Sequence, residues 1–295
     1  MKTKSAKYVI GIHIFFILFS LVFLIPLLYV ISISLSAEDA IRTFGYTLLP
    51  KVWDLSAYRY VTSNMSSLLS AYKVTIIISA AGCFLSVLVM AMVAYPLSRS
   101  NFYFRNSFTF FIFFTMLFGG GLIPTYILIT QYLNMGNTLW VYILPHLANA
   151  WHIIIIRTFF SQLPSSLVES AKIDGAGETR IFFSIVLPLS KPVIATVALL
   201  ILLERWNDWY TALIYIREES LYSLQYLLQR ILREAEFVKN MSSQMGGVNT
   251  DMLTETPTET VRFAMVLIAA GPMLVVFPFF QKYFTRGLTV GAVKG

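Results

Sequence analysis

Three polar residues with functional chemistry are regularly spaced inside one apolar stretch of this 295-residue chain. His146, Asn149 and His152 are three residues apart, so on one helix their side chains would drift slowly around a face and share a polar stripe. Imidazole and amide groups both donate and accept hydrogen bonds. The stripe could therefore line a path for a polar solute, or it could only hold neighbouring helices together.

A second polar group lies near the outer end of the fifth apolar run. Glu204 and Asp208 are four residues apart, with Arg205 beside the first. A charge at the centre of a bilayer costs about 2.5–3.5 kcal/mol on insertion scales, so these side chains should face a bundle interior, a water-filled path or the outer interface. Aromatic residues that could stack on a solute, or equally anchor the chain at a membrane interface, are Trp206, Trp209 and Tyr210.

Motifs for enzymatic chemistry are missing from the sequence. It contains no Gly-Lys dipeptide, which excludes a phosphate-binding loop of the G-x-x-x-x-G-K-[ST] type. No H-E-x-x-H occurs and Cys83 is the single cysteine, so no zinc site is expected. His146 and His152 are six apart, too far around a helix for the i,i+4 spacing of a metal-binding pair. No nucleophile elbow is present, which argues against an enzyme.

The composition indicates what kind of elements must position these residues. Hydrophobic residues make up 57% of the chain and charged residues 13%, against about 25% charged in a soluble domain. These values exclude a disordered chain, a coiled coil and an ordinary soluble enzyme, and they indicate an all-α polytopic membrane protein. The net charge of +7 could indicate nucleic-acid binding, but the apolar runs are too long for such a module, so no nucleic-acid partner is expected.

Six apolar runs are long enough to cross a bilayer as helices, which takes about 20 residues each. The first is about twice as long as the apolar part of a signal peptide, so we expect it to be retained. Residues 1–295 are predicted to form one transmembrane domain, with outer loops at 34–72 and 215–260 and a cytoplasmic loop at 161–190. The predicted spans are residues 8–33, 73–97, 107–130, 139–160, 191–214 and 261–280.

The basic residues are distributed unevenly around these spans. With six spans, the two termini and the loops at 97–106 and 157–192 lie on one side of the membrane. That side carries 12 basic and three acidic residues, whereas the remaining segments carry 10 basic and 12 acidic ones. Positively charged loops stay in the cytoplasm, so both termini are expected to be cytoplasmic.

Proline and glycine interrupt several of the spans. Gly119, Gly120 and Gly121 precede Pro124 in the third span, and Pro145 lies in the fourth. Membrane helices tolerate such breaks where neighbouring groups or water satisfy the freed backbone. The interruptions predict either simple kinks and close helix packing or a hinge that lines a path.

The cytoplasmic loop carries the most informative pattern, LPSSLVESAKIDGAGETRIFFSIVLPLSKP over residues 163–192. A short helix is predicted from Ser166 to Ile173. Ser165 or Ser166 could cap its start, and Gly175 would end it because a positive φ costs glycine little.

A second short helix is predicted from Glu178 to Val186, and Pro188 would separate it from the fifth span. Helices of this length are marginal alone in water, so something must hold them. Small residues around Gly175 would let the backbone enter a cleft on a partner protein. The alternative is an amphipathic loop that only rests on lipid.

This loop resembles the EAA motif of permease subunits in bacterial ABC importers, which runs E-A-A, then D-G-A, then I-x-L-P. The matching segments are Glu169-Ser170-Ala171, Asp174-Gly175-Ala176 and Ile185-Val186-Leu187-Pro188. The one departure is Ser170 in place of alanine, and serine is nearly as small. Trp206-Asn207-Asp208 and the closing residues 291–295 resemble the maltose-type carbohydrate-uptake subfamily. The stretches at 119–126 and 221–231 resemble its oligosaccharide-handling branch.

The resemblance implies a function and a set of partners. Such a permease moves a sugar or oligosaccharide across the bacterial cytoplasmic membrane by alternating access, after an extracytoplasmic solute-binding protein has delivered it. A second permease subunit completes a heterodimer within the membrane lipid. Two ATPase subunits bind ATP and Mg, so this chain is expected to bind no cofactor and no metal itself.

The resemblance also assigns roles to residues. The loop is expected to dock on an ATPase subunit as a coupling helix between the fourth and fifth spans. The coupling residues are Glu169, Ser170, Ala171, Asp174, Gly175, Ala176, Ile185, Leu187 and Pro188. The tail expected to reach the ATPases is Gly291, Ala292, Val293, Lys294 and Gly295. The residues that could line the substrate path are His146, Asn149, His152, Trp206, Asn207 and Asp208.

Other transport functions stay open at this point. An importer for a different nutrient could use the same loop. A secondary transporter driven by an ion gradient could also have six spans, although no internal repeat is visible in the sequence.

Overall fold

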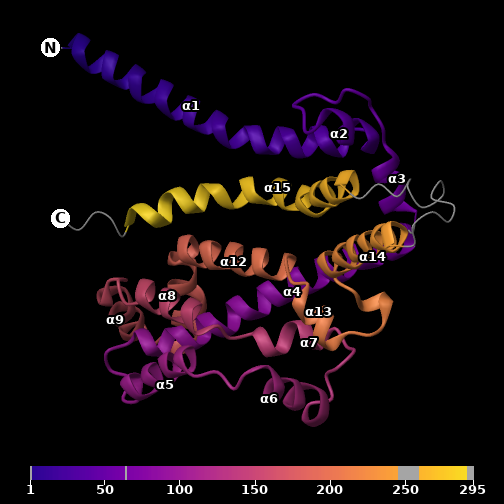
Figure 1. The fold of residues 1–295 in the computed structure, drawn as a ribbon. Helices are drawn as coiled ribbons and strands as arrows, with labels where there is room; N and C mark the ends of the chain where they lie inside the picture. Colours follow the sequence, from indigo (N-terminus) through magenta and orange to yellow (C-terminus); the bar gives the residue numbers. More distant parts are fainter. Residues whose placement is uncertain (1, 64, 245–258, 291–295) are drawn as a thin grey trace. The chain divides into compact units, whose positions relative to one another are not determined.

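The computed structural model describes residues 2–63, 65–244 and 259–290, and within these ranges the regular structure is helical apart from one β-bridge between Ser36 and Trp53 (Figure 1). The predicted all-α class is confirmed for this part of the chain. The first helices are α1 (Lys2–Ser34), α2 (Glu38–Phe44), α3 (Ser56–Thr62), α4 (Met65–Ser98), α5 (Arg105–Leu117) and α6 (Leu122–Ile127) with a π-helical turn η1 (Leu128–Tyr132). Next come α7 (Trp140–Ile143), the 3₁₀ turn η2 (Leu144–His146), α8 (Ala150–Phe160), α9 (Ser165–Ile173), α10 (Glu178–Ile181), the π-helical turn η3 (Phe182–Val186) and α11 (Leu187–Leu189). The last are α12 (Lys191–Trp206), α13 (Tyr210–Tyr215), the 3₁₀ turn η4 (Glu219–Leu221), α14 (Leu224–Gln244) and α15 (Glu259–Val290).

The chain divides into two compact units, Met1–Ser66 with Leu228–Pro272 and Ser67–Leu227 with Met273–Gly295. The second unit contains the polar residues and the loop singled out from the sequence. Within it, α9 lies near α8 at one end, whereas α7 and α13 lie toward the other end (Figure 1). The prediction of a single domain over residues 1–295 stays a prediction.

Three helices are long and apolar enough to cross a membrane unbroken: Tyr8–Ser34, Met65–Ser98 and Glu259–Phe280. Three further segments reach that length only as bent pairs of helices. These pairs are Arg105–Leu117 with Leu122–Tyr132 at 110°, Trp140–His146 with Ala150–Phe160 at 51°, and Glu178–Leu189 with Lys191–Trp206 at 80°. The described residues therefore offer three to six spans, and six requires each bent pair to contribute one span.

Two of the bent pairs, and the end of α12 at Trp206, correct three spans that were predicted as continuous helices. The span predicted at 107–130 breaks after Leu117, because Gly121 has a φ of 80° that no helix contains. The span predicted at 139–160 breaks between η2 and α8. The span predicted at 191–214 ends at Trp206 and resumes as α13. The interruptions flagged by Gly119–Gly121 and Pro145 are thus breaks in the helices.

Two hydrophobic clusters hold the second unit together along α4. The cluster near α9 includes Met90, Ile156, Ile181 and Val197. The cluster near α13 includes Ile78, Val141, Tyr142 and Ala212. Because α4 contributes to both, it connects the loop end of this unit to its other end.

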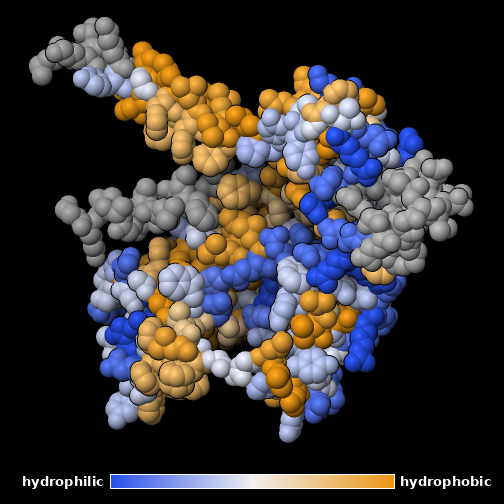
Figure 2. All heavy atoms as spheres, viewed as in Figure 1, coloured by the Kyte–Doolittle hydropathy of each residue, from blue (hydrophilic) through white to orange (hydrophobic). Residues whose placement is uncertain are grey.

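Some helices keep their apolar side chains on the outside. The apolar window of α1 is 0% buried, and α5 buries none of its residues. Figure 2 shows hydrophobic side chains over the visible surface of α1. A helix that is apolar all round cannot be stable in water on its own, so these surfaces fit a lipid environment or a partner helix.

Candidate functional site

The loop at 161–190 presents α9 with one face buried and the other exposed. Val168 and Ala171 are buried in the cluster shared with α4 and α8. Glu169 and Asp174 are exposed, and Ile173 is 86% exposed. Because an apolar residue so open to solvent gains nothing from the fold of this chain, α9 offers a small apolar contact flanked by two carboxylates.

Backbone geometry sets both ends of α9. Pro164 occupies the N-cap and makes no side-chain hydrogen bond, so the predicted serine cap is wrong. At the other end Gly175 has a φ of 78°, as predicted. Its N–H donates to the carbonyl of Lys172 at 3.0 Å, and the N–H of Ala176 donates to that of Ala171 at 2.9 Å. These two bonds form a Schellman motif, which fixes the direction in which the chain leaves the helix.

The second helix of the loop is longer than predicted. It begins at Glu178 as expected, continues through η3 and ends at Leu189, so Pro188 lies inside the helical segment and does not terminate it. A π-helical turn precedes the proline and relaxes the demand for regular i→i−4 bonds there. The direction changes by 80° at the buried Ser190, which separates the loop from α12.

A polar network ties the loop to α4. The Glu178 carboxylate accepts a hydrogen bond from the Tyr95 hydroxyl at 2.6 Å and pairs with the Lys172 ammonium at 2.6 Å. The Arg99 guanidinium lies 4.6 Å from the centre of the Tyr95 ring. Sequence reasoning missed this network, because Tyr95 is one residue in a long apolar run and nothing local distinguishes it.

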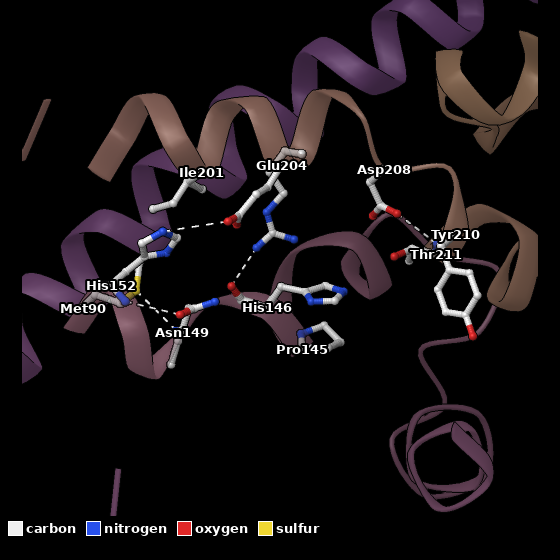
Figure 3. Close-up of a pocket in the computed structure, with 12 residues that line it drawn as sticks. Met90, Pro145, His146, Asn149, His152, Ile201, Glu204, Asp208, Tyr210 and Thr211 are labelled. Carbon is white, nitrogen blue, oxygen red and sulfur yellow. Dashed lines mark hydrogen bonds and ion pairs between the residues drawn. The ribbon is translucent and has the colours of Figure 1, made fainter. Parts of the chain in front are cut away.

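A pocket of about 270 Å³ opens at the other polar group (Figure 3). Four of the six residues predicted for a substrate path line it: His146, Asn149, His152 and Asp208. The other two do not. Trp206 is buried, and the Asn207 amide donates to the Leu203 carbonyl at 2.8 Å. Glu204 and Arg205, the charged neighbours noted in the sequence, also line it, together with Tyr210 and Thr211.

The predicted polar stripe is not on one helix. His146 lies in the 3₁₀ turn η2, and Asn149 is the N-cap of α8, where its Oδ1 accepts from the N–H of His152 at 3.3 Å. The helix axis bends by 51° between them. The three side chains line one pocket, but they do so from both sides of the break and not from one helix.

Charged groups face the pocket from α12 and from the turn that follows it. The Glu204 carboxylate lies 3.8 Å from Nε2 of His152; its side chain is 60% exposed, whereas that of His152 is 3% exposed. One oxygen of Asp208, the residue before the N-cap Trp209, accepts from the N–H of Thr211 at 3.0 Å and so satisfies an N–H in the first turn of α13. The arrangement can hold a polar ligand through hydrogen bonds.

The buried Arg205 guanidinium holds the helix break itself. It donates to the carbonyl of Tyr142 at 2.6 Å and to that of His146 at 2.7 Å. These carbonyls lie at the end of the helical segment, so the arginine stabilises the backbone where the helix breaks. Gly82 of α4 lies beside the arginine, and a Cβ there would make an ordinary contact with Nε of Arg205 at 3.5 Å.

Within the ranges that the structure describes, no group of three or more His, Cys, Asp or Glu side chains could hold a metal ion. The predicted C-terminal tail, residues 291–295, lies outside those ranges.

Comparison with known proteins gives a consistent result over nearly the whole chain. The family model described as binding-protein-dependent transport system inner membrane component matches residues 87–290. The polygalacturonan/rhamnogalacturonan transport system permease protein YtcP of Bacillus subtilis is 38% identical, over 99% of this chain and 100% of its own length. The arabinooligosaccharides transport system permease protein AraQ of Halalkalibacterium halodurans is 30% identical, with all of both chains covered.

A solved structure resembles the fold as well. It is a chain from the crystal structure of a bacterial ABC transporter involved in the import of the acidic polysaccharide alginate. The two chains superpose with a TM-score of 0.76 and are 29% identical, and the match covers 96% of this chain and 98% of the other.

Proposed function

This chain belongs to the family of binding-protein-dependent transport system inner membrane components, and from that premise we propose how it works. It is a permease subunit of a carbohydrate importer of the ABC class, a transport component and not an enzyme. An ATPase and a solute-binding protein are its partners. The observation that carries this conclusion is the family match over residues 87–290, supported by relatives that cover the whole length.

We propose six spans for this multi-pass membrane protein, with both termini in the cytoplasm. The bent pairs at 105–132 and 140–160 each cross once, and α12 is the fifth span while residues 178–189 stay in the cytoplasmic loop. The excess of basic residues on the termini and on the loops at 97–106 and 157–192 supports this orientation. The membrane is the bacterial cytoplasmic membrane. In this orientation α9 faces the cytoplasm, and α14 lies in an outer loop.

The coupling proposal assigns α9 and the turn after it to the ATPase contact. The exposed Ile173 enters a cleft on the ATPase, while Glu169 and Asp174 pair with its basic residues. ATP binding can shift the transporter between inward- and outward-open states only if the ATPase contacts differ between those states. The Schellman turn at Gly175 and the network around Glu178 would carry such a difference into α4.

The remaining parts of the proposal concern neighbouring molecules. This chain pairs with a second, different permease subunit, and the complex contains two ATPase subunits that hold ATP and Mg. The tail at 291–295 reaches the ATPases. The pocket lined by His146, Asn149, His152 and Asp208 is this chain's contribution to the sugar path.

Reconstitution of the assembled importer tests the function. The complex is purified in mild detergent, its subunits are identified, and uptake of labelled oligosaccharides into proteoliposomes is measured with and without ATP. We expect an ATPase and a second permease to co-purify and uptake to require ATP and the binding protein. Uptake that persists without ATP, driven by an ion gradient, would reject the proposal.

A further inference from the structure

We propose that the pocket of this chain binds an uncharged, hydroxyl-rich sugar unit and disfavours a carboxylated one. The inference rests on the proposed function, because it names the substrate class for the same path. It follows from the charged groups that line the pocket and from how many of them are available to a ligand.

The polar lining is rich in groups that accept hydrogen bonds. Glu204 and Asp208 are carboxylates, and His146 and His152 each carry an acceptor nitrogen, whereas Oδ1 of Asn149 already accepts from the N–H of His152. The Glu204 side chain is 60% exposed, and its 3.8 Å separation from His152 is too long for a hydrogen bond. The described contacts of Asp208 occupy one of its two side-chain oxygens. Sugar hydroxyls donate well to such carboxylates, in charge-assisted bonds.

The one guanidinium in the pocket lining is already engaged. Two of the Arg205 nitrogens donate to the carbonyls of Tyr142 and His146, and the side chain packs beside Gly82. Arg205 is 6% exposed. A carboxylate on the ligand would have to compete with both carbonyls for these donors, and winning them would release the helix break. Arg205 therefore cannot make the bidentate contact by which an arginine recognises a carboxylate.

A buried histidine nitrogen points to a ligand independently. The His152 side chain lines the pocket and is 3% exposed, and its Nδ1 has no hydrogen-bond partner among the described residues. Buried polar atoms without partners are rare, and each needs an explanation. A small rotation of the ring toward the pocket would let a ligand hydroxyl donate to this nitrogen. In the tautomer with the proton on Nε2, the nitrogen that faces Glu204, Nδ1 is an acceptor, and an ionised acid, which only accepts, would not satisfy it.

The charge balance then discriminates between ligands. The lining holds two carboxylates against one guanidinium that is committed to the backbone. A neutral sugar meets acceptors that it can satisfy, whereas a sugar acid brings a third carboxylate toward two others. Like charges at close range in a partly dry site repel strongly.

The test uses two trisaccharides that differ only in the oxidation state of C6, galactotriose and trigalacturonate. The whole importer is placed in lipid nanodiscs without its binding protein, and binding of each labelled sugar is measured by equilibrium dialysis. We expect galactotriose to bind at least tenfold more tightly. In the double variant Glu204→Gln with Asp208→Asn, the gap should shrink to about threefold or less, because the repulsion is gone and the hydrogen bond to the N–H of Thr211 is kept. The variant Asp39→Asn, an exposed carboxylate outside the pocket, should keep the wild-type ratio.

Three results would overturn the inference. These are equal or tighter binding of trigalacturonate, a ratio that the double variant leaves unchanged, and no binding of either sugar. ATP-dependent uptake in proteoliposomes with the binding protein, measured in parallel, separates this inference from the proposed function. Carbohydrate uptake that continues in any of these cases leaves the proposed function standing, and its complete absence contradicts that function.

Discussion

At the scale of single residues, the backbone conformation at position 175 favours glycine, whereas the space around it does not require one. Its φ is 78°, and a Cβ built on it would meet nothing within 4 Å. A side chain there costs about 1–2 kcal/mol in the left-handed region, although it causes no clash. Sequence reasoning found this residue because a positive φ at a helix end is a local requirement that glycine signals directly.

Replacing Gly175 by alanine should therefore weaken coupling without unfolding the chain. The Gly175→Ala variant is expected to import several-fold fewer sugars per ATP hydrolysed, since the strained turn no longer fixes α9 relative to the next helix. Uptake and ATPase rates in proteoliposomes give the ratio. Gly177→Ala is the matched control, because Gly177 has a φ of −71° and open space around it. Equal ratios in the two variants would contradict the role given to this turn.

The Tyr95 hydroxyl makes the second residue-scale prediction. In Tyr95→Phe the hydrogen bond to the Glu178 carboxylate, 2.6 Å long, is lost, at a cost of about 1 kcal/mol because Glu178 is partly exposed to water. We expect ATP hydrolysis to continue while uptake per ATP falls. Tyr103→Phe, at a position that is 90% exposed, serves as the control. If both variants retain the wild-type ratio, the network does not transmit the ATPase motion.

At the scale of helices, the sequence predicts where elements lie better than where they break. Gly121 and Pro145 mark two of the breaks locally. The break before α8 is stabilised by Arg205, which lies about 60 residues away in the chain and donates to the carbonyls of Tyr142 and His146. The hydrophobic periodicity of an apolar run carries no information about such a distant partner. The polar residues could thus be found from the sequence, but their meeting in one pocket could not.

Arginine at position 205 should be irreplaceable by lysine. A single ammonium cannot donate in a fork to both carbonyls, so Arg205→Lys is expected to cost about 1–3 kcal/mol through the loss of a charge-assisted hydrogen bond to a backbone carbonyl. The measurement is the thermal unfolding midpoint of the purified complex, which should drop by several degrees. Arg217→Lys, at an exposed position, should leave it unchanged. An unaltered midpoint in Arg205→Lys would show that the break does not need this clamp.

A carboxylate from α2 caps α15 in the other unit, and its charge makes the cap sensitive to pH. Glu38 accepts from the N–H of Thr260 at 3.0 Å, from its hydroxyl at 2.9 Å and from the N–H of Glu259 at 3.2 Å. Burial raises the pKa of Glu38, but these hydrogen bonds and the charge of Arg42 together lower it by more than burial raises it. The net pKa therefore lies below its ordinary value. The stabilisation is therefore present above the ordinary glutamate pKa of about 4.3 and is lost as the pH falls through the lower folded value.

Amide hydrogen exchange at the start of α15 checks this cap. Protection factors there should be constant from neutral pH down to about pH 5 and should drop only in the more acidic range. Glu38→Gln should lower protection at neutral pH and remove the acid step, whereas Asp39→Asn should behave as the wild type. An acid step that survives in Glu38→Gln would assign the effect to another group.

At the scale of the whole molecule, the account depends on where the loop at 161–190 lies and what it touches. Composition and charge distribution predicted a polytopic helical protein, and the EAA-type spacing predicted the family, because both are carried by the sequence itself. The contact with an ATPase forms only in the assembled complex, so this chain shows only its own side of that interface. We propose that this side is α9, with Ile173 exposed and Gly175 fixing the turn.

The most direct measurement is site-specific photo-crosslinking from α9 in the assembled importer. The test variant carries the substitution Ile173→benzoylphenylalanine, at a position that is 86% exposed. The control variant carries Phe237→benzoylphenylalanine in α14, at a position that is 64% exposed. Irradiation followed by mass spectrometry identifies the partner. We predict an adduct with the ATPase subunit from position 173 and none from position 237. Adducts from position 173 with lipid or with the binding protein alone would contradict the account.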